Sequence, residues 1–465
     1  MPIIRKQDGQ QEESPYAPLR LTNNPFLQDP IIRPRSKDPR ANGAIFADGC
    51  RREVISRFEK LLINDFDNRA RLSLLWSDGD KESGRGTGKT ALLRHFQHRI
   101  NHDWGQSEFR KFNAAVIYVA FPDQVDRLYS EQLAWAALVD AHESGLMRAA
   151  AASIRIPVVE KRWPDAAKKL IADVEQREKD GKEWYELLLT NDHLSKYGVD
   201  GDELARIVIE DLVDADIDEA VAEAFASNGL LDYLRTFRRD GQVRPYWVSR
   251  DTRGLGTAKH LFFDQLVRFL DKTGFPGAYL FVDDIENLTD QMSNKHSIEF
   301  AKELGLACLR PGRAAGDQRY FSAVLTTHQQ AATKLARGWS EAGLQAVARL
   351  DPTAETSIRV PLPIEDGALE MMAAYIEKHR SEGPPVDRLH PFTEEAARKL
   401  VSGVQPPLHP RTFLQKAYFA VKQAADDKAE RIDVKDIERI LETTGTKSTS
   451  PTTATSTEIE EFPDY

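Results

Sequence analysis

Cysteine is scarce in this sequence: 465 residues contain two, Cys50 and Cys308, far apart in the chain. Two separated cysteines argue against a disulfide-stabilised secreted domain, and no nearby histidine pattern indicates a zinc site. Apolar runs of about 18 residues, the length that a transmembrane helix needs, are also missing. The first residues lack the hydrophobic core of a signal peptide. We therefore expect a soluble, cytoplasmic protein with no membrane partner.

The sequence also has no excess of positive charge. The formal net charge is −10, from 63 Lys and Arg against 73 Asp and Glu. This balance does not indicate a protein that coats nucleic acid, although a local basic patch stays compatible with it, because binding follows the distribution of charge. A hydrophobic content of 41% in a chain of this length is enough for two or three domains with buried cores.

Strand-like and helix-like segments alternate along much of the chain. Almost wholly apolar runs at 72–76, 114–121, 278–282 and 320–327 are each followed by apolar residues at helical spacing. This alternation predicts an α/β fold with a parallel sheet covered by helices on both faces. We expect an extended N-terminal arm (1–43), a core in two parts (44–144 and 258–362), a helical insertion (145–257), a C-terminal helical lid (363–444) and a disordered tail (445–465).

A glycine-rich motif, SGRGTGKT, lies between the first predicted strand and the next helix. In a P-loop, small residues let backbone N–H groups surround phosphate oxygens, a lysine reaches the β- and γ-phosphates, and a hydroxyl binds Mg²⁺. Lys89 and Thr90 supply these groups, and Ser83 replaces the usual first glycine. A surface turn that ends in GKT by chance is the alternative. The predicted ATP-binding residues are Ser83, Gly84, Arg85, Gly86, Thr87, Gly88, Lys89, Thr90 and Ala91.

An acidic motif, AYLFVDDIENL, ends the third predicted strand. In P-loop NTPases an aspartate at this place holds Mg²⁺, and a nearby side chain orients the attacking water. We assign Asp283 to the metal, together with Thr90, and Asp284 to the water. Glu286 is a substitute because the Asp284 side chain is short. Acidic residues that merely cap the end of a strand are the alternative.

Together the two motifs resemble AAA+ P-loop ATPases of the origin-recognition initiator type, with some features similar to the STAND signalling ATPases. The resemblance spans roughly residues 44–140 and 258–442 and implies ATP hydrolysis. Most AAA+ proteins have glutamate where Asp284 stands, so this position departs from the pattern. The segment FADGCRREVISRF lies where initiator-type ATPases flank the adenine, which implies base contacts from Ile45 and Phe46.

The resemblance also implies polar contacts with the γ-phosphate. YFSAVLTTH resembles the fourth core strand, which ends in a polar sensor. Thr327 is the first candidate for it, followed by Thr326 and His328. STAND proteins have arginine where His328 stands. HPRTFLQKAYFAV resembles the sensor-2 helix of the lid, which implies a contact from Arg411.

An arginine finger is a further implication of the resemblance. LQAVARLDPTAETSIRVPLP resembles the segment that carries it, and Arg349 matches the place, with Arg337 and Arg359 as competitors. Such an arginine projects into the ATP site of a neighbouring subunit and stabilises the transferring phosphoryl group, which implies a homo-oligomer. For both Arg349 and Arg411 the alternative is a solvated or ion-paired surface arginine.

Arginine and aromatic residues are interleaved between Arg235 and Arg253, at the end of the predicted insertion. Arginines neutralise phosphates while aromatic rings stack on bases, so this stretch is a candidate DNA contact. The alternative is that these arginines pair with the acidic segment 200–223. The final residues, EIEEFPDY, are either a docking peptide for a protein partner or a tail without a role.

Two functional hypotheses follow. The first is an ATP-hydrolysing AAA+ protein that acts as a DNA-associated regulator or motor in a multi-component prokaryotic-type system, for replication, transposition or anti-phage defence. This hypothesis rests on analogy. The second is a STAND-like signalling switch that oligomerises with ATP and activates a protein effector. A degenerate nucleotide-binding scaffold is disfavoured because Lys89, Thr90 and Asp283 are all present.

Overall fold

The computed structural model describes residues 14–33, 36, 38–47, 49–64, 72–79, 86–102, 114–120, 129–180, 182–217, 219–226, 265–266, 268–273, 277–290, 292–309, 321–346, 348–384, 386–404 and 408–445. Two compact units form. One comprises Arg52–Pro361, and the other comprises Met1–Arg51 together with Leu362–Tyr465.

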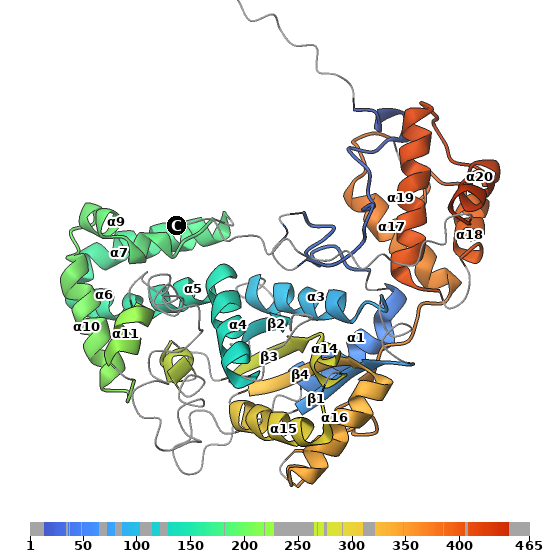
Figure 1. The fold of residues 1–465 in the computed structure, drawn as a ribbon. Helices are drawn as coiled ribbons and strands as arrows, with labels where there is room; N and C mark the ends of the chain where they lie inside the picture. Colours follow the sequence, from blue (N-terminus) through green and yellow to red (C-terminus); the bar gives the residue numbers. More distant parts are fainter. Residues whose placement is uncertain are drawn as a thin grey trace, which may run out of the picture. The chain divides into compact units, whose positions relative to one another are not determined.

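A parallel sheet lies at the centre of the first unit (Figure 1). The described residues give it five strands in the order β2–β3–β4–β1–β5, all paired in parallel. The α/β fold with a parallel sheet is therefore confirmed. The strands are β1 (Leu72–Ser77), β2 (Ala114–Ala120), β3 (Gly277–Asp283), β4 (Phe321–His328) and β5 (Ile358–Arg359).

Helices cover both faces of the sheet, which is why its strands are apolar on both sides. From β1 the chain crosses to the far edge strand β2 and then returns strand by strand, so right-handed crossovers place α3 on one face and α15 and α16 on the other (Figure 1). These helices, with their neighbours, are α1 (Arg52–Phe58), η3 (Glu59–Asn64), α3 (Lys89–His102), α4 (Tyr129–Glu143), α14 (Ile285–Thr289), α15 (Asn294–Leu309) and α16 (Gln329–Glu341).

Side chains along each strand alternate between the two faces. On the α3 face the rings of Phe58 and Phe96 stack with centroids 4.1 Å apart, and Phe58 meets Phe281 of β3 edge-on. On the other face Leu280 and Leu325 belong to the core that includes residues of α15 and α16. The buried aromatic layer on the first face therefore fixes α3, and with it Lys89, against the sheet.

Between α4 and β3 the chain forms a helical insertion whose described part shares one hydrophobic core with the sheet. Buried Arg155 donates to the carbonyl oxygens of Leu188 and Ala226, each over 2.7 Å, and so satisfies the carboxyl ends of two helices. The helices are α5 (Leu146–Ser153), α6 (Arg155–Arg162), α7 (Pro164–Lys179), α8 (Glu186–Leu189), α9 (Asn191–Lys196), α10 (Gly201–Val213) and α11 (Glu219–Ala226).

The second unit is a helical bundle with the N-terminal segment packed into it. Leu19, Leu21 and Phe26 are buried in the same core as the helices, and Leu21 forms an antiparallel bridge with Arg380. The segment expected to be an extended arm is thus part of this unit over its described residues. The elements are η1 (Ala17–Leu19), η2 (Gly49–Arg51), α17 (Glu365–Lys378), α18 (Glu394–Ser402), α19 (Pro410–Asp426) and α20 (Val434–Gly445).

Membrane-spanning helices are not found in the part of the chain that the structure describes, because none of its helices is long and apolar enough to cross a bilayer.

Candidate active site

The carboxyl ends of β1, β4 and β3 form the edge of the sheet where the predicted motifs meet. Ser77 pairs with His328, and Val282 pairs with Leu325, so these strands end at similar heights. Ligands of parallel α/β sheets bind beyond this edge. Three segments far apart in sequence therefore contribute to one candidate site.

Lys89 is the first residue of α3 and is buried. Its Nζ donates to Ser77 Oγ over 2.9 Å and to Thr87 Oγ1 over 3.4 Å. Gly86 and Gly88 have φ angles of 72° and 92°, which glycine adopts without strain, and they turn the chain sharply into the helix. The lysine charge thus lies at the positive end of the helix dipole, an arrangement that favours an anion.

The remaining residues of the predicted P-loop divide into two groups. Thr90 and Ala91 continue α3 and are half-buried, and Thr87 is buried just before the helix. Ser83, Gly84 and Arg85 lie outside the described residues. The described half of the loop therefore consists of the glycine turn, the lysine and the hydroxyl.

Asp283 is the last residue of β3, and two hydroxyl groups hold its buried carboxylate. Tyr118 of β2 donates to Oδ2 over 2.6 Å, and Thr326 of β4 donates to Oδ1. Thr326 Oγ1 also accepts from the amide of Asp284 over 3.1 Å. The carboxylate keeps free lone pairs beyond these two bonds, since it has about four acceptor positions.

The two threonines at the end of β4, Thr326 and the sensor candidate Thr327, have different contacts. Thr326 and Thr327 are both fully buried, but neighbouring side chains of a strand point to opposite faces. Thr326 contacts Asp283, whereas the Thr327 hydroxyl donates to the carbonyl oxygen of His328. His328 itself caps α16, because its Nδ1 accepts from the amide of Ala331 over 3.3 Å. Of the two threonines, Thr326 is therefore the one whose side chain contacts Asp283.

Glu286 lies in the short helix α14 and is 4% exposed. Among the described residues, its Oε2 is a buried carboxylate oxygen that has no hydrogen-bond partner. Burial raises its pKa, the nearby Lys89 charge lowers it and Asp283 raises it, with a net shift upward. A desolvated carboxylate without a partner near a buried lysine is typical of functional sites.

Asp284, between these two acids, turns the chain from β3 into α14. Its φ angle is 56°, in the left-handed region that aspartate tolerates better than most residues. The residue is half-buried, and its amide donates to Thr326 as described. The turn places Asp284 and Glu286 in different surroundings: Asp284 is partly open to solvent and Glu286 is enclosed.

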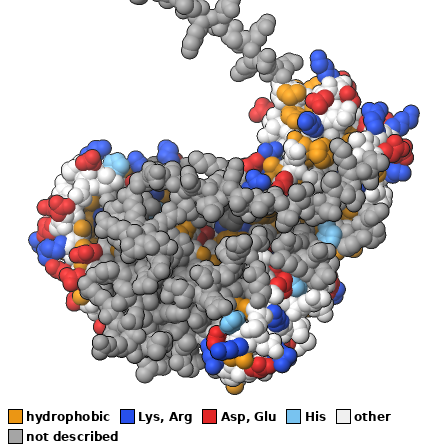
Figure 2. Space-filling view, in the orientation of Figure 1, with side chains coloured by type: hydrophobic (Ala, Val, Ile, Leu, Met, Phe, Trp, Pro, Cys, Tyr) orange, Lys and Arg blue, Asp and Glu red, His pale blue; other side chains and the backbone are white. Residues whose placement is uncertain are grey.

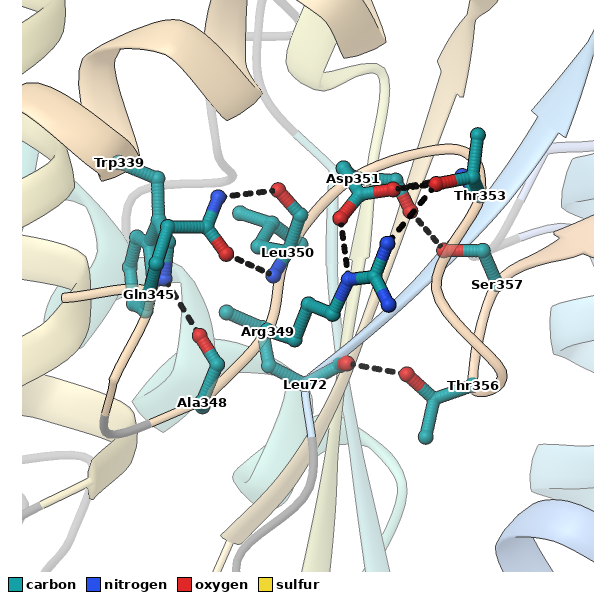
Figure 3. Close-up of polar contacts among 10 residues, drawn as sticks. All are labelled: Leu72, Trp339, Gln345, Ala348, Arg349, Leu350, Asp351, Thr353, Thr356 and Ser357. Atoms are coloured by element: carbon teal, nitrogen blue, oxygen red, sulfur yellow. Dashed lines mark hydrogen bonds and ion pairs between the residues drawn. The ribbon is translucent and has the colours of Figure 1, made fainter.

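Arg349 belongs to the loop between α16 and β5 (Figure 3). Its guanidinium donates to Asp351 Oδ2 over 2.8 Å and to Thr353 Oγ1 over 3.0 Å, and its side chain is 61% exposed. The same loop is fixed to the first residue of β1, because Thr356 Oγ1 donates to the Leu72 carbonyl oxygen. Arg349 therefore lies near the amino ends of the strands, at the edge opposite to Lys89.

The other predicted arginines have local ion partners. Arg359 is the last residue of β5, and its Nε lies 3.0 Å from Oδ2 of Asp78, the residue after β1. Arg337 pairs with Glu341 one turn along α16. Exposed ion pairs of this kind contribute little to stability, about 0–1 kcal/mol.

The remaining predicted nucleotide contacts, Arg411, Ile45 and Phe46, belong to the helical unit. Within that unit Arg411 Nη2 lies 2.8 Å from Asp29 Oδ1, Ile45 is buried and Phe46 is half-buried. Inside its unit Arg411 is thus an ion-paired surface arginine, which was the alternative to a nucleotide contact.

The predicted DNA contact between Arg235 and Arg253 lies outside the described residues. Two acidic residues of the 200–223 segment pair with arginines of the described insertion helices: Glu203 with Arg162 over 2.9 Å and Glu210 with Arg206 over 2.6 Å. Figure 2 shows red and blue side chains intermixed over these helices.

A group of buried polar residues at the β2 edge was not found by reading the sequence. Asp140 of α4 accepts from the Tyr118 amide over 2.7 Å and from Gln97 Nε2 over 3.0 Å. Arg94 of α3 lies 3.8 Å from the Asp140 carboxylate and 5.0 Å from the centre of the Tyr118 ring. One signal was present in the sequence, namely a tyrosine inside a buried strand, whose hydroxyl needs a partner.

The oxygen atoms at the carboxyl edge fit a small, hard cation whose remaining ligands would come from a bound phosphate compound and water. Among the described residues, no cluster of three or more His, Cys, Asp or Glu side chains could hold a metal alone. Mg²⁺ is usually bound by one or two carboxylates, waters and substrate phosphates, not by an all-protein cage. The Asp283 carboxylate and the Thr90 hydroxyl are oxygen ligands of that kind.

Comparison of the chain with protein-family models, with curated proteins and with solved structures finds no match.

The Asp140 carboxyl makes a testable contribution to folding. Burial raises its pKa from 3.8 to about 7 against the opposing effects of the Tyr118 amide, Arg94 and Gln97. The folded state therefore keeps a proton that the unfolded state loses, and the free energy of unfolding falls as pH rises from about 4 to about 7. Asp140→Asn removes this titration.

We expect the variant to gain about 2–3 kcal/mol relative to the wild type between about pH 5 and pH 8, at 1.36 kcal/mol per pKa unit. Thermal unfolding of both proteins at the two pH values measures the change. Asp211→Asn, at an exposed carboxylate of α10, is the control. A stability difference that stays constant with pH would contradict the raised pKa.

Proposed function

We propose that this chain binds Mg²⁺–ATP at the carboxyl edge of its sheet and hydrolyses it, as an ATPase of the AAA+ kind. One observation carries the proposal: buried Lys89 at the start of α3 lies near buried Glu286, whose Oε2 has no hydrogen-bond partner among the described residues. Burial of both groups is costly without a function. A polyphosphate and its attacking water would engage the two charges.

Each residue at the edge has a role in this proposal. The Lys89 ammonium contacts the β- and γ-phosphates, and the N–H groups around Gly86 and Gly88 point at phosphate oxygens. Thr90 and Asp283 would hold Mg²⁺, which would supply positive charge against the phosphates. Thr326 and Tyr118 keep the Asp283 carboxylate in one orientation through their hydroxyls.

Glu286 is the residue that we assign to the attacking water. A general base must be ionised yet desolvated, and its pKa must lie nearer the working pH than that of an ordinary glutamate. Burial gives Glu286 this property, and its Oε2 accepts no other bond. The half-buried Asp284 forms the turn that carries Glu286 into the site. We therefore prefer Glu286 over Asp284 for this role, whereas the sequence favoured Asp284.

Arg349 fits the proposed role of a finger that acts between subunits. It lies at the edge of the sheet opposite to Lys89, and the length of β1 from Leu72 to Ser77 separates the two edges by about 17 Å at 3.3 Å per residue. An arginine cannot span that distance to its own ATP site. Its contact with Asp351 and Thr353 keeps the side chain at the surface, where a second subunit would meet it.

The biological role that we propose is that of a DNA-associated regulator or motor that works as a homo-oligomer with a protein partner. The arginine-rich and aromatic sequence between Arg235 and Arg253 supports DNA binding. Glu203 and Glu210 of the insertion already pair with Arg162 and Arg206. These two carboxylates are therefore less available to the arginines between Arg235 and Arg253. A signalling switch that uses ATP to assemble is the second candidate.

Removal of the lysine charge should abolish nucleotide binding. In Lys89→Ala the phosphates lose their main cation, so we expect ATP affinity to fall by at least about 100-fold, as charge-assisted bonds of about 3 kcal/mol predict. Calorimetric titration with Mg²⁺–ATP measures it. The matched control is Lys295→Ala, an exposed lysine in the first turn of α15. Wild-type affinity in Lys89→Ala would refute the proposed P-loop.

The two acids after Asp283 should differ in their effect on turnover. Loss of a general base slows a reaction by about 10²- to 10⁴-fold. We expect that loss in Glu286→Gln, with ATP affinity unchanged, and a smaller loss in Asp284→Asn. Single-turnover hydrolysis by both variants checks the assignment. A larger loss in Asp284→Asn would return the role to Asp284.

Hydrolysis per subunit should rise with protein concentration, and Arg349→Ala should remove that rise. Mixing Arg349→Ala with Lys89→Ala should restore part of the activity, because each protein supplies what the other lacks at a shared site. Arg337→Ala, at an exposed arginine of α16, is the control.

Single- or double-stranded DNA added to the same assay separates the two roles: stimulation supports the DNA-associated protein, and no effect supports the signalling switch. An activity independent of concentration, with no complementation, would contradict the arginine finger.

A further inference from the structure

Tyr118 connects the candidate metal-binding carboxylate to the edge of the sheet. Its hydroxyl donates to Asp283 Oδ2 over 2.6 Å, while its side chain is 4% exposed. Among the strands that the structure describes, β2 lies at one edge of the sheet, so its outer N–H groups face no described strand. The Tyr118 amide donates instead to Asp140 Oδ2 over 2.7 Å. Tyr118 therefore donates one hydrogen bond to Asp283 from its side chain and another to Asp140 from its backbone.

Arg94 closes a ring of contacts around the tyrosine. It lies on α3, five residues after Lys89, with its guanidinium carbon 5.0 Å from the centre of the Tyr118 ring, within cation–π range. The same guanidinium lies 3.8 Å from the Asp140 carboxylate and donates to Gln97, which in turn donates to Asp140. Contacts from α3 and α4 therefore hold Tyr118 in place.

Asp140 lies in the last turn of α4, where the core meets the helical insertion. Gly145, with a φ angle of 77°, is the N-cap of α5 and lies only two residues after the end of α4. The helices α5 to α11 continue the same buried core that contains residues of α4. A movement of the insertion that displaces α4 would therefore displace Asp140 and the Tyr118 backbone with it.

We propose that Tyr118 is a positioning residue for Asp283, and that Asp140 and Arg94 set its position, so that the helical insertion influences metal binding at the site. The inference rests on the proposed ATPase function and deepens it. Tyr118 touches neither nucleotide nor metal in this arrangement. It acts by restricting the rotation of the carboxylate that would hold Mg²⁺.

The size of the expected effect follows from metal sites in general. Residues that hydrogen-bond a metal ligand commonly change metal affinity by about 10- to 100-fold when they are removed. Thr326 still holds Asp283 Oδ1 when the tyrosine hydroxyl is lost, so the carboxylate stays in place but gains freedom at Oδ2. The lower end of that range, about tenfold, is the expected change.

The test uses the full-length protein and the Mg²⁺ dependence of ATP hydrolysis. Tyr118→Phe removes only the hydroxyl and keeps the ring under Arg94. We expect the Mg²⁺ concentration for half-maximal activity to rise about tenfold, while the binding of metal-free ATP and the melting temperature stay near wild-type values. The matched control is Tyr279→Phe, a buried tyrosine on the neighbouring strand four residues before Asp283.

A double-mutant cycle tests the connection to the insertion. Asp140→Asn should also raise the Mg²⁺ requirement, by several-fold, and this effect should disappear when Tyr118 is already phenylalanine. Arg94→Lys, which keeps the charge but not the planar guanidinium, is a second variant that should behave like Asp140→Asn. Additive effects of Asp140→Asn and Tyr118→Phe would overturn the coupling.

The outcomes separate this inference from the proposed function. A wild-type protein that neither binds nor hydrolyses ATP would overturn both. An active wild type whose Tyr118→Phe variant keeps the same Mg²⁺ requirement would overturn the role of Tyr118 alone. An unchanged requirement in Asp140→Asn, with a raised one in Tyr118→Phe, would confine the effect to the tyrosine and contradict the influence of the insertion.

Discussion

Parallel pairing of β1 with β4 and of β4 with β3 brings the last residues of three strands to one edge of the sheet. Lys89 follows the first of these strands after a loop, Thr326 lies near the end of the second, and Asp283 ends the third. These residues are far apart in the sequence, but the pairing register of the strands determines which of them come together. A shift of one residue in β4 would turn Thr326 away from Asp283 and bring Thr327 to it.

The buried polar groups at this edge are mostly satisfied by one another. Asp283 accepts bonds from two hydroxyls, and Lys89 donates to Ser77. Glu286 Oε2 is a buried carboxylate oxygen at this edge that lacks a hydrogen-bond partner among the described residues, and the indole Nε1 of Trp76 lacks one as well. An unsatisfied buried carboxylate costs more than the roughly 1–3 kcal/mol of a neutral group, and a proposed role at the site would explain why the fold keeps one. That contrast is the physical basis for the assignment of Glu286 to the attacking water.

Much of the fold could be predicted from the sequence, because apolar runs mark the four longer strands and helical spacing marks the lid helices. The glycine-rich motif and Asp283 could be proposed from the sequence as parts of a phosphate site, because P-loop chemistry depends on short, fixed spacings. Thr326 could not be preferred over Thr327, since the choice depends on which face of β4 meets Asp283. The contact between Tyr118 and Asp140 depends on tertiary packing. Phe26 has no periodic neighbours that would reveal its burial.

The central claim is that the carboxyl edge of the sheet is a Mg²⁺–ATP site. The most direct test is a crystal structure of the full-length protein with Mg²⁺ and a non-hydrolysable ATP analogue. The account predicts the γ-phosphate beside Lys89, the metal between Thr90 and Asp283, and an ordered water within hydrogen-bond distance of Glu286. A nucleotide bound elsewhere, or an edge that stays without ligand at saturating analogue, would contradict it.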